Sequence, residues 1–264
     1  MNPTITTPPT ATPQGSSASR PSAAPSPTAK GRLVTDAPTR VFHGLFALCF
    51  IGAYLTADGE KWRLLHVVLG YSMAGLLLFR VLYGIWGPKP SHLSSLWRKV
   101  APSRTWLQGC FRLRSWDAVS AHWRQGQNLL MGVAVITLLV GVVPLVLSGY
   151  ATYNDWGDVW GGEWLEETHE WLGEAFLWVV LAHVALVLAI SLWRRKNHAT
   201  LMWSGRVPGS GPDLVRHNRV WLAVLLLAAV LAYVAWEWQA SPQGLVPWRV
   251  LTTPAAWVED GDDD

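Results

Sequence analysis

The stretch THEWLGEAFLWVVLAHVALVLAISLW, residues 168–193, decides the fold of this chain. It is apolar over most of its length, and it exceeds the roughly 20 residues that a helix needs to cross a bilayer. Two histidines, His169 and His183, interrupt it 14 residues apart. Fourteen residues advance a helix by about 21 Å and return to within about 40° of the same face. The stretch therefore predicts a membrane-crossing helix with one imidazole near each membrane surface.

The composition of the whole chain agrees with a membrane protein. Of its 264 residues, 50% are hydrophobic and 15% are charged, whereas soluble domains average about 25% charged residues. The 18 tryptophans are typical of the aromatic belts at the two membrane surfaces. Four further apolar runs predict helices over residues 38–56, 64–86, 129–150 and 220–238. We therefore expect an all-α integral membrane protein, with a four-helix transmembrane bundle and a fifth transmembrane helix.

Charges in the connecting segments predict the orientation, because basic loops stay in the cytoplasm. Bases dominate after the second and fourth predicted helices: Lys89, Arg98, Lys99, Arg104, Arg112, Arg114 and Arg124, then Arg194, Arg195, Lys196 and Arg206. Acids dominate between the third and fourth helices: Asp155, Asp158, Glu163, Glu166 and Glu167. This pattern predicts a multi-pass protein of the bacterial inner membrane, with a cytoplasmic N-terminus and a periplasmic C-terminus.

The chain divides into three predicted parts. Residues 1–31 are rich in Pro, Ser, Thr and Ala and hold no acid, so we expect a disordered cytoplasmic tail. Residues 32–208 form the four-helix core. Residues 209–264 hold the fifth helix and an acidic periplasmic tail.

Four histidines in the predicted helices fall at two depths. An ionisable side chain inside a bilayer is costly and marks a candidate functional site. His43 and His183 lie toward the cytoplasm, and His66 and His169 lie toward the outside. These two layers predict two bis-histidine haem sites, with the four imidazoles as iron ligands. Because no C-x-x-C-H motif occurs, the haem is expected to be non-covalent haem b.

Three further residues are candidates for binding the cofactor. Arg80 lies 14 residues after His66, and Arg40 lies one turn before His43. Each guanidinium suits a haem propionate, although both also fit ordinary positive-inside anchors. Gly70 follows His66 by one turn, which would let a flat macrocycle approach, or would serve close helix packing.

Several motifs resemble a known family. The first motif is TDAPTRVFH over residues 35–43. The second predicted helix holds HVVLGY over 66–71, Phe79-Arg80 and YGIWGP over 83–88. The fourth predicted helix and the segment after it hold His169-Glu170, His183-Val184 and MWSG over 202–205. Together they resemble the bacterial cytochrome b561 family, which includes the b-type cytochrome subunit of nickel–iron hydrogenases. The resemblance implies a four-helix core with two b haems, and it carries the ligands onto His43, His66, His169 and His183. Gly44 departs from the family, which usually has an aromatic residue there, and the fifth helix exceeds the core.

The leading functional hypothesis is transmembrane electron transfer in a respiratory chain. The protein would link the quinone pool to a redox partner such as a c-type cytochrome, a hydrogenase or another periplasmic oxidoreductase; quinol oxidation or quinone reduction on the chain itself stays open. One alternative is a transporter or metal permease with a histidine-lined path. Another is a non-redox membrane anchor subunit. No feature indicates a nucleic-acid partner.

The segment between the third and fourth helices suggests a separate hypothesis. Tryptophans at 156, 160 and 164 would share one face of a short interfacial helix. This helix could cover a quinol site, in which Glu163, Glu166, Glu167 or Glu170 would accept protons. The alternatives are interfacial anchoring by the tryptophans and docking of a basic partner by the acids.

Overall fold

The computed structural model describes residues 31–103, 106, 108, 116–157, 163–195, 197, 200–207 and 211–241, with side chains from residue 122 in the segment 116–157. The tail before residue 31 and the acidic tail from residue 242 lie outside these residues, as do residues 158–162 of the interfacial helix predicted over 156–164. The described elements are β1 (Arg32–Leu33), α1 (Ala37–Leu55), η1 (Glu60–Trp62), α2 (Arg63–Trp86), η2 (Lys89–Ser91), α3 (Leu93–Val100), α5 (Trp116–Tyr153), α7 (Trp164–Arg194), α8 (Thr200–Ser204), β2 (Arg206–Val207) and α9 (Val220–Ala240).

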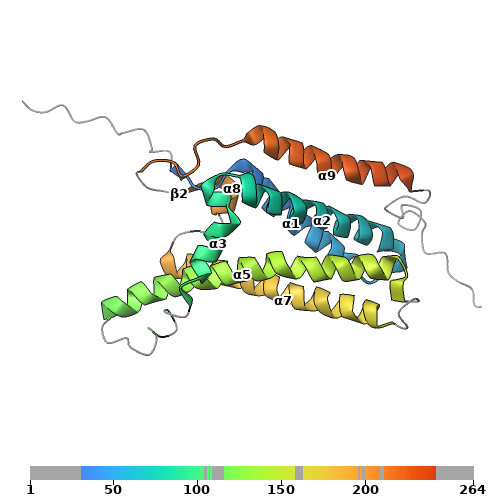
Figure 1. Ribbon diagram of the computed structural model, residues 1–264, viewed down its shortest axis with the longest axis horizontal. Helices are drawn as coiled ribbons and strands as arrows, with labels where there is room; N and C mark the ends of the chain where they lie inside the picture. The colour runs from blue at the N-terminus through green and yellow to red at the C-terminus, as the bar shows by residue number, and fades with distance from the viewer. Residues whose placement is uncertain are drawn as a thin grey trace, which may run out of the picture. The chain divides into compact units, whose positions relative to one another are not determined.

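Five helices in the described part of the chain are long and apolar enough to cross a membrane: α1, α2, α5, α7 and α9 (Figure 1). They match the five predicted spans one to one, so the all-α membrane fold is confirmed. The boundaries differ most at α5, which begins at Trp116 rather than near residue 129. The apolar run marks only the part of a helix that lies in lipid, and the helix continues beyond it through polar residues.

The membrane helices pack as neighbouring pairs. α5 packs along α7 and α1 packs along α2, while α2 also contacts α5 and α9 lies against α1. Phe50 of α1 meets Phe176 of α7 edge to face, with ring centroids 5.0 Å apart. Large side chains such as Trp178, 69% exposed, point away from the bundle. Lipid is as apolar as these side chains, so close packing and hydrogen bonds stabilise the bundle more than hydrophobic burial does.

Short polar segments hold one end of the bundle together. β1 pairs with β2 in antiparallel register, Arg32 opposite Val207. The Leu33 amide donates to Asp213 Oδ1 over 2.6 Å, and the Ala37 amide donates to Asn218 Oδ1 over 2.9 Å. The starts of α1 and α9 and the segment after α7 therefore meet. We call this the basic end; the acidic end is the opposite one, where α2 and α7 begin.

Asp36 is the centre of a buried polar cluster at the basic end. It is fully buried and caps α1 by accepting from the Thr39 amide, as the sequence predicts. Its carboxylate also accepts from the hydroxyls of Tyr83 and Ser91. Arg80 lies near enough to attract it electrostatically. A buried carboxylate needs such partners, because an unpaired charge in an apolar interior is strongly unfavourable.

Candidate functional site

His66 and His169 come together at the acidic end of the bundle. Both lie near the start of a helix, His66 on α2 and His169 on α7. Their ring centroids are 5.9 Å apart and the ring planes are nearly perpendicular, at 89°. The pair predicted from depth is therefore also a pair in space, and both imidazoles can face one centre.

Hydrogen bonds select the tautomer of both rings. His66 Nδ1 lies 2.8 Å from the carbonyl oxygen of Ala53, and His169 Nδ1 lies 3.1 Å from that of Leu145. A carbonyl oxygen only accepts, so these contacts favour a hydrogen on each Nδ1. The Ser148 hydroxyl next to His169 Nδ1 is compatible with this tautomer as an acceptor, because it donates its own hydrogen to the Leu145 carbonyl. Each Nε2 then keeps its lone pair, as an imidazole must to bind a metal ion.

Helix α5 shapes the surroundings of His169, although no α5 residue was predicted for the site. Ser148 Oγ lies 3.1 Å from His169 Nδ1. A Cβ added at Gly149 would lie 2.7 Å from Cε1 of the same ring, so the absent side chain makes room for the imidazole. One turn farther, the buried hydroxyl of Thr152 has no hydrogen-bond partner. The only sequence signal was the pair of small residues at 148 and 149.

His43 and His183 are the second predicted pair, toward the basic end. They lie near enough to each other for one imidazole to affect the other electrostatically. Nδ1 of His183 is buried and has no hydrogen-bond partner. A cavity of about 450 Å³ opens beside His43, lined by Ala37, Arg40, Val41, His43, Gly44, Met202 and Trp203. This pair has space and unpaired polar atoms beside it, but it lacks the carbonyl acceptors that orient the first pair.

The two candidate arginines lie in different settings. Arg40 lines the cavity beside His43 and donates to the Trp203 carbonyl over 2.8 Å, while its buried Nε has no partner. Arg80 is 8% exposed and donates to the Ser91 carbonyl over 3.0 Å. The structure thus places Arg40 beside a candidate ligand and Arg80 inside the Asp36 cluster.

Glycines leave open space next to three of the four histidines. A Cβ added at Gly70, Gly173 or Gly44 would meet no atom within 4 Å. Gly70 and Gly173 each follow their histidine by four residues, on α2 and α7, and Gly44 adjoins His43. The residues present therefore fit a flat macrocycle that lies against these helices.

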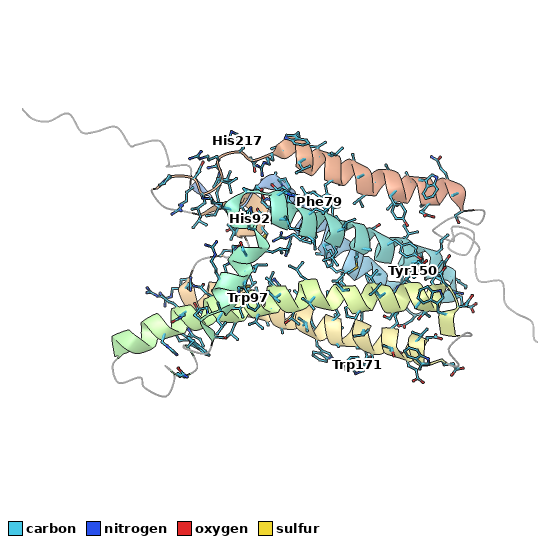
Figure 2. The ribbon with its side chains drawn as sticks, viewed as in Figure 1. Phe79, His92, Trp97, Tyr150, Trp171 and His217 are labelled. Carbon is cyan, nitrogen blue, oxygen red and sulfur yellow. The ribbon has the colours of Figure 1, made fainter. Side chains whose placement is uncertain are left out.

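The other described histidines lie away from these pairs. Figure 2 shows His92 and His217 at the basic end, outside the membrane helices. His92 Nε2 is 2.7 Å from the Gly87 carbonyl oxygen. Among the described residues, no three His, Cys, Asp or Glu side chains lie together as a metal-ion site.

Comparison with known proteins gives one result. No curated protein and no solved structure matches the chain. The family model described as prokaryotic cytochrome b561 matches residues 34–205. This range holds all four membrane histidines and the helices that carry them, and it stops before α9. The chain is therefore a multi-pass membrane protein that belongs to the prokaryotic cytochrome b561 family, a family of haem-b electron carriers.

Proposed function

We propose that the chain binds two b haems, one between His66 and His169 and one between His43 and His183. The observation that carries this proposal is the contact of Nδ1 with a backbone carbonyl in both His66 and His169, because it favours a lone pair on each Nε2, the atom that would bind iron. A bound haem b would supply a one-electron redox centre whose two filled axial positions leave no open site for substrate. Gly70 makes room for the macrocycle beside His66, and Arg40 and Arg80 are the proposed partners of the propionates.

We further propose how the chain is oriented in the membrane and between which molecules it transfers electrons. The basic end faces the cytoplasm of the inner membrane, because basic segments are retained there. The two histidine pairs then form a two-step route for electrons between the membrane surfaces. The route links the quinone pool to a redox partner, such as a c-type cytochrome or a periplasmic oxidoreductase. The membrane potential changes the energy of each electron that crosses by about 2.3 kcal/mol per 100 mV.

Haem quantitation on histidine variants tests the proposal. The purified chain is expected to hold two haems with a reduced-minus-oxidised spectrum of low-spin b type. Each of His43→Ala, His66→Ala, His169→Ala and His183→Ala should remove one haem, while the exposed loop variant His217→Ala should remove none.

Double variants test the pairing. His66→Ala with His169→Ala should still leave one haem, whereas His66→Ala with His43→Ala should leave none. A wild-type chain without a Soret band would contradict the proposal and favour a transporter or an anchor subunit.

A further inference from the structure

We infer that the acidic end of the bundle carries a binding site for a quinone head group, bounded by Glu60, Arg63 and Tyr153. The inference rests on the proposed function, because it gives a place to the quinone which that function requires. The site is built from residues of η1, the start of α2 and the end of α5. Side chains of α9 lie behind it.

A cavity is present at this place. It has a volume of about 370 Å³ and is lined by Glu60, Arg63, Leu64 and Tyr153. The guanidinium carbon of Arg63 lies 5.5 Å from the centre of the Tyr153 ring, in a cation–π contact. Such contacts are attractive by about 0.5–2 kcal/mol, so they hold a hydrogen-bond donor and an aromatic face side by side. A quinone ring offers the matching groups, a flat face and two carbonyl acceptors.

Aromatic rings extend from the cavity into the bundle. Tyr153 meets the edge of Tyr71, with centroids 6.4 Å apart. Tyr71 also lies 6.2 Å from Tyr150, which in turn meets Trp156 at 5.7 Å. Figure 2 shows Tyr150 where the ends of α2 and α5 come together. This cluster gives one wall of the cavity a continuous aromatic backing, which suits an aromatic ligand better than a lipid chain.

The fifth helix contributes the polar side of this cluster. Tyr233 and Glu237 of α9 lie close to each other, and both are near enough to Tyr71 to affect it electrostatically. Residues 220–240 lie beyond the part of the chain that matches the family. The structure therefore gives α9 a task that the four-helix core does not explain: it completes the aromatic cluster behind the cavity.

Charge favours a neutral ligand. The cavity wall holds one cation, Arg63, and one carboxylate, Glu60. A lipid phosphate at this position would meet Arg63 but would be repelled by Glu60. A quinone carbonyl accepts from Arg63 without that repulsion.

The position of the cavity also suits electron exchange between a bound quinone and the haem proposed between His66 and His169. Arg63 precedes His66 by three residues on α2, which is less than one helical turn, or about 4.5 Å along the axis. A head group bound against Arg63 therefore lies close to the proposed outer haem site. Glu60, Arg63 and Tyr153 are exposed, so the cavity is open to a ligand from outside the bundle.

Photo-crosslinking on the full-length purified protein tests the site. An azido derivative of a short-chain ubiquinone is expected to label peptides that contain Arg63 or Tyr153. Decylubiquinone in excess should suppress the labelling. Labelling at the cavity beside His43 instead would overturn this site while leaving the proposed function intact.

Equilibrium binding of decylubiquinone to variants gives a second readout that does not depend on turnover. Tyr153→Leu and Arg63→Gln should each weaken binding about tenfold, which corresponds to 1.4 kcal/mol. Tyr54→Leu is the matched control, since Tyr54 is a tyrosine of similar exposure, 43% against 38%, outside the cavity. It should leave binding unchanged, and Tyr153→Phe should keep most of it. All variants should retain wild-type haem content, which shows that they fold.

The outcomes separate the two proposals. Equal binding by wild type, Tyr153→Leu and Arg63→Gln overturns the site alone. Absence of quinone binding in a haem-loaded wild type overturns both the site and the quinone link. Displacement of the probe by an anionic phospholipid, with no competition from decylubiquinone, assigns the cavity to a lipid head group and overturns the inference.

Discussion

At the scale of single residues, the orientation of an imidazole depends on neighbours far away in the chain. His169 is held by the Leu145 carbonyl and by Ser148, and its ring occupies the space left by Gly149. Hydrogen bonds of this kind fix the tautomer of a metal ligand, and their loss typically lowers metal affinity by 10- to 100-fold. The surroundings of the ligand are therefore as decisive as the ligand itself.

Gly149→Ala tests this setting. The new Cβ would lie 2.7 Å from the His169 ring, so the ring must move and haem affinity at the outer site should fall about tenfold. Alanine otherwise stabilises a helix by about 1 kcal/mol relative to glycine. Gly75→Ala, where the new Cβ meets no atom within 4 Å, should show only that gain. Haem titration of the two apoproteins measures the difference; equal affinities would contradict the role of Gly149.

Gly70→Leu distinguishes room for a macrocycle from close helix packing. No described atom lies within 4 Å of an added Cβ at Gly70, so a larger side chain should not disturb the helices themselves. If the space holds haem, the variant should lose the outer haem and keep its thermal stability as an apoprotein. Gly75→Leu serves as the control. Haem content and apoprotein unfolding, measured side by side, decide between the two explanations.

At the scale of elements, hydropathy predicted the membrane part of each helix and little outside it. α5 runs into the basic segment because nothing in its polar residues ends the helix there. The 14-residue spacing predicts that Arg80 lies on the same helix face as His66. It does not predict the hydrogen bond from Arg80 to the Ser91 carbonyl, because Ser91 lies beyond the end of α2. Ser148 and Gly149 escaped prediction because the rotation of α5 about its axis is set by packing. The histidine depths, by contrast, follow from helix geometry alone.

Asp36→Asn tests the buried cluster at the start of α1. The variant keeps an oxygen that can accept from the Thr39 amide but leaves Arg80 buried without its opposite charge. The amide nitrogen of the new Asn cannot accept from the Tyr83 hydroxyl as the carboxylate does. Leaving a buried donor unpaired costs about 1–3 kcal/mol, so the unfolding temperature should fall clearly. Asp58→Asn, at an exposed loop position, should leave it unchanged.

Haem content of the same variant reports on Arg80. If Asp36→Asn loses both thermal stability and the haem proposed between His43 and His183, Arg80 is assigned to a propionate of that haem. Loss of stability alone would assign it to the Asp36 cluster. Unchanged stability would contradict the structural role of the cluster.

At the scale of the whole molecule, the distribution of charge predicts the direction of insertion. The starts of α1 and α9 lie together at the basic end, so they should share the cytoplasmic side. A phosphatase fused after residue 241 should be active, and one fused after residue 100 should be inactive. Fluorescent-protein fusions at the same positions should give the opposite pattern, because that reporter matures only in the cytoplasm. An active phosphatase at residue 100 would reverse the assignment.

The pairing of β1 with β2 has a consequence for biosynthesis. Arg32 and Leu33 pair with residues 206–207, Leu33 also donates to Asp213, and Ala37 donates to Asn218. These partners leave the ribosome only after α1, α2, α5 and α7 have been made. The seam at the basic end can therefore form only after the four-helix core has been made. The four histidines proposed as ligands all precede residue 206 in the sequence. We therefore expect an interval, after they reach the bilayer and before the seam closes, in which haem can enter.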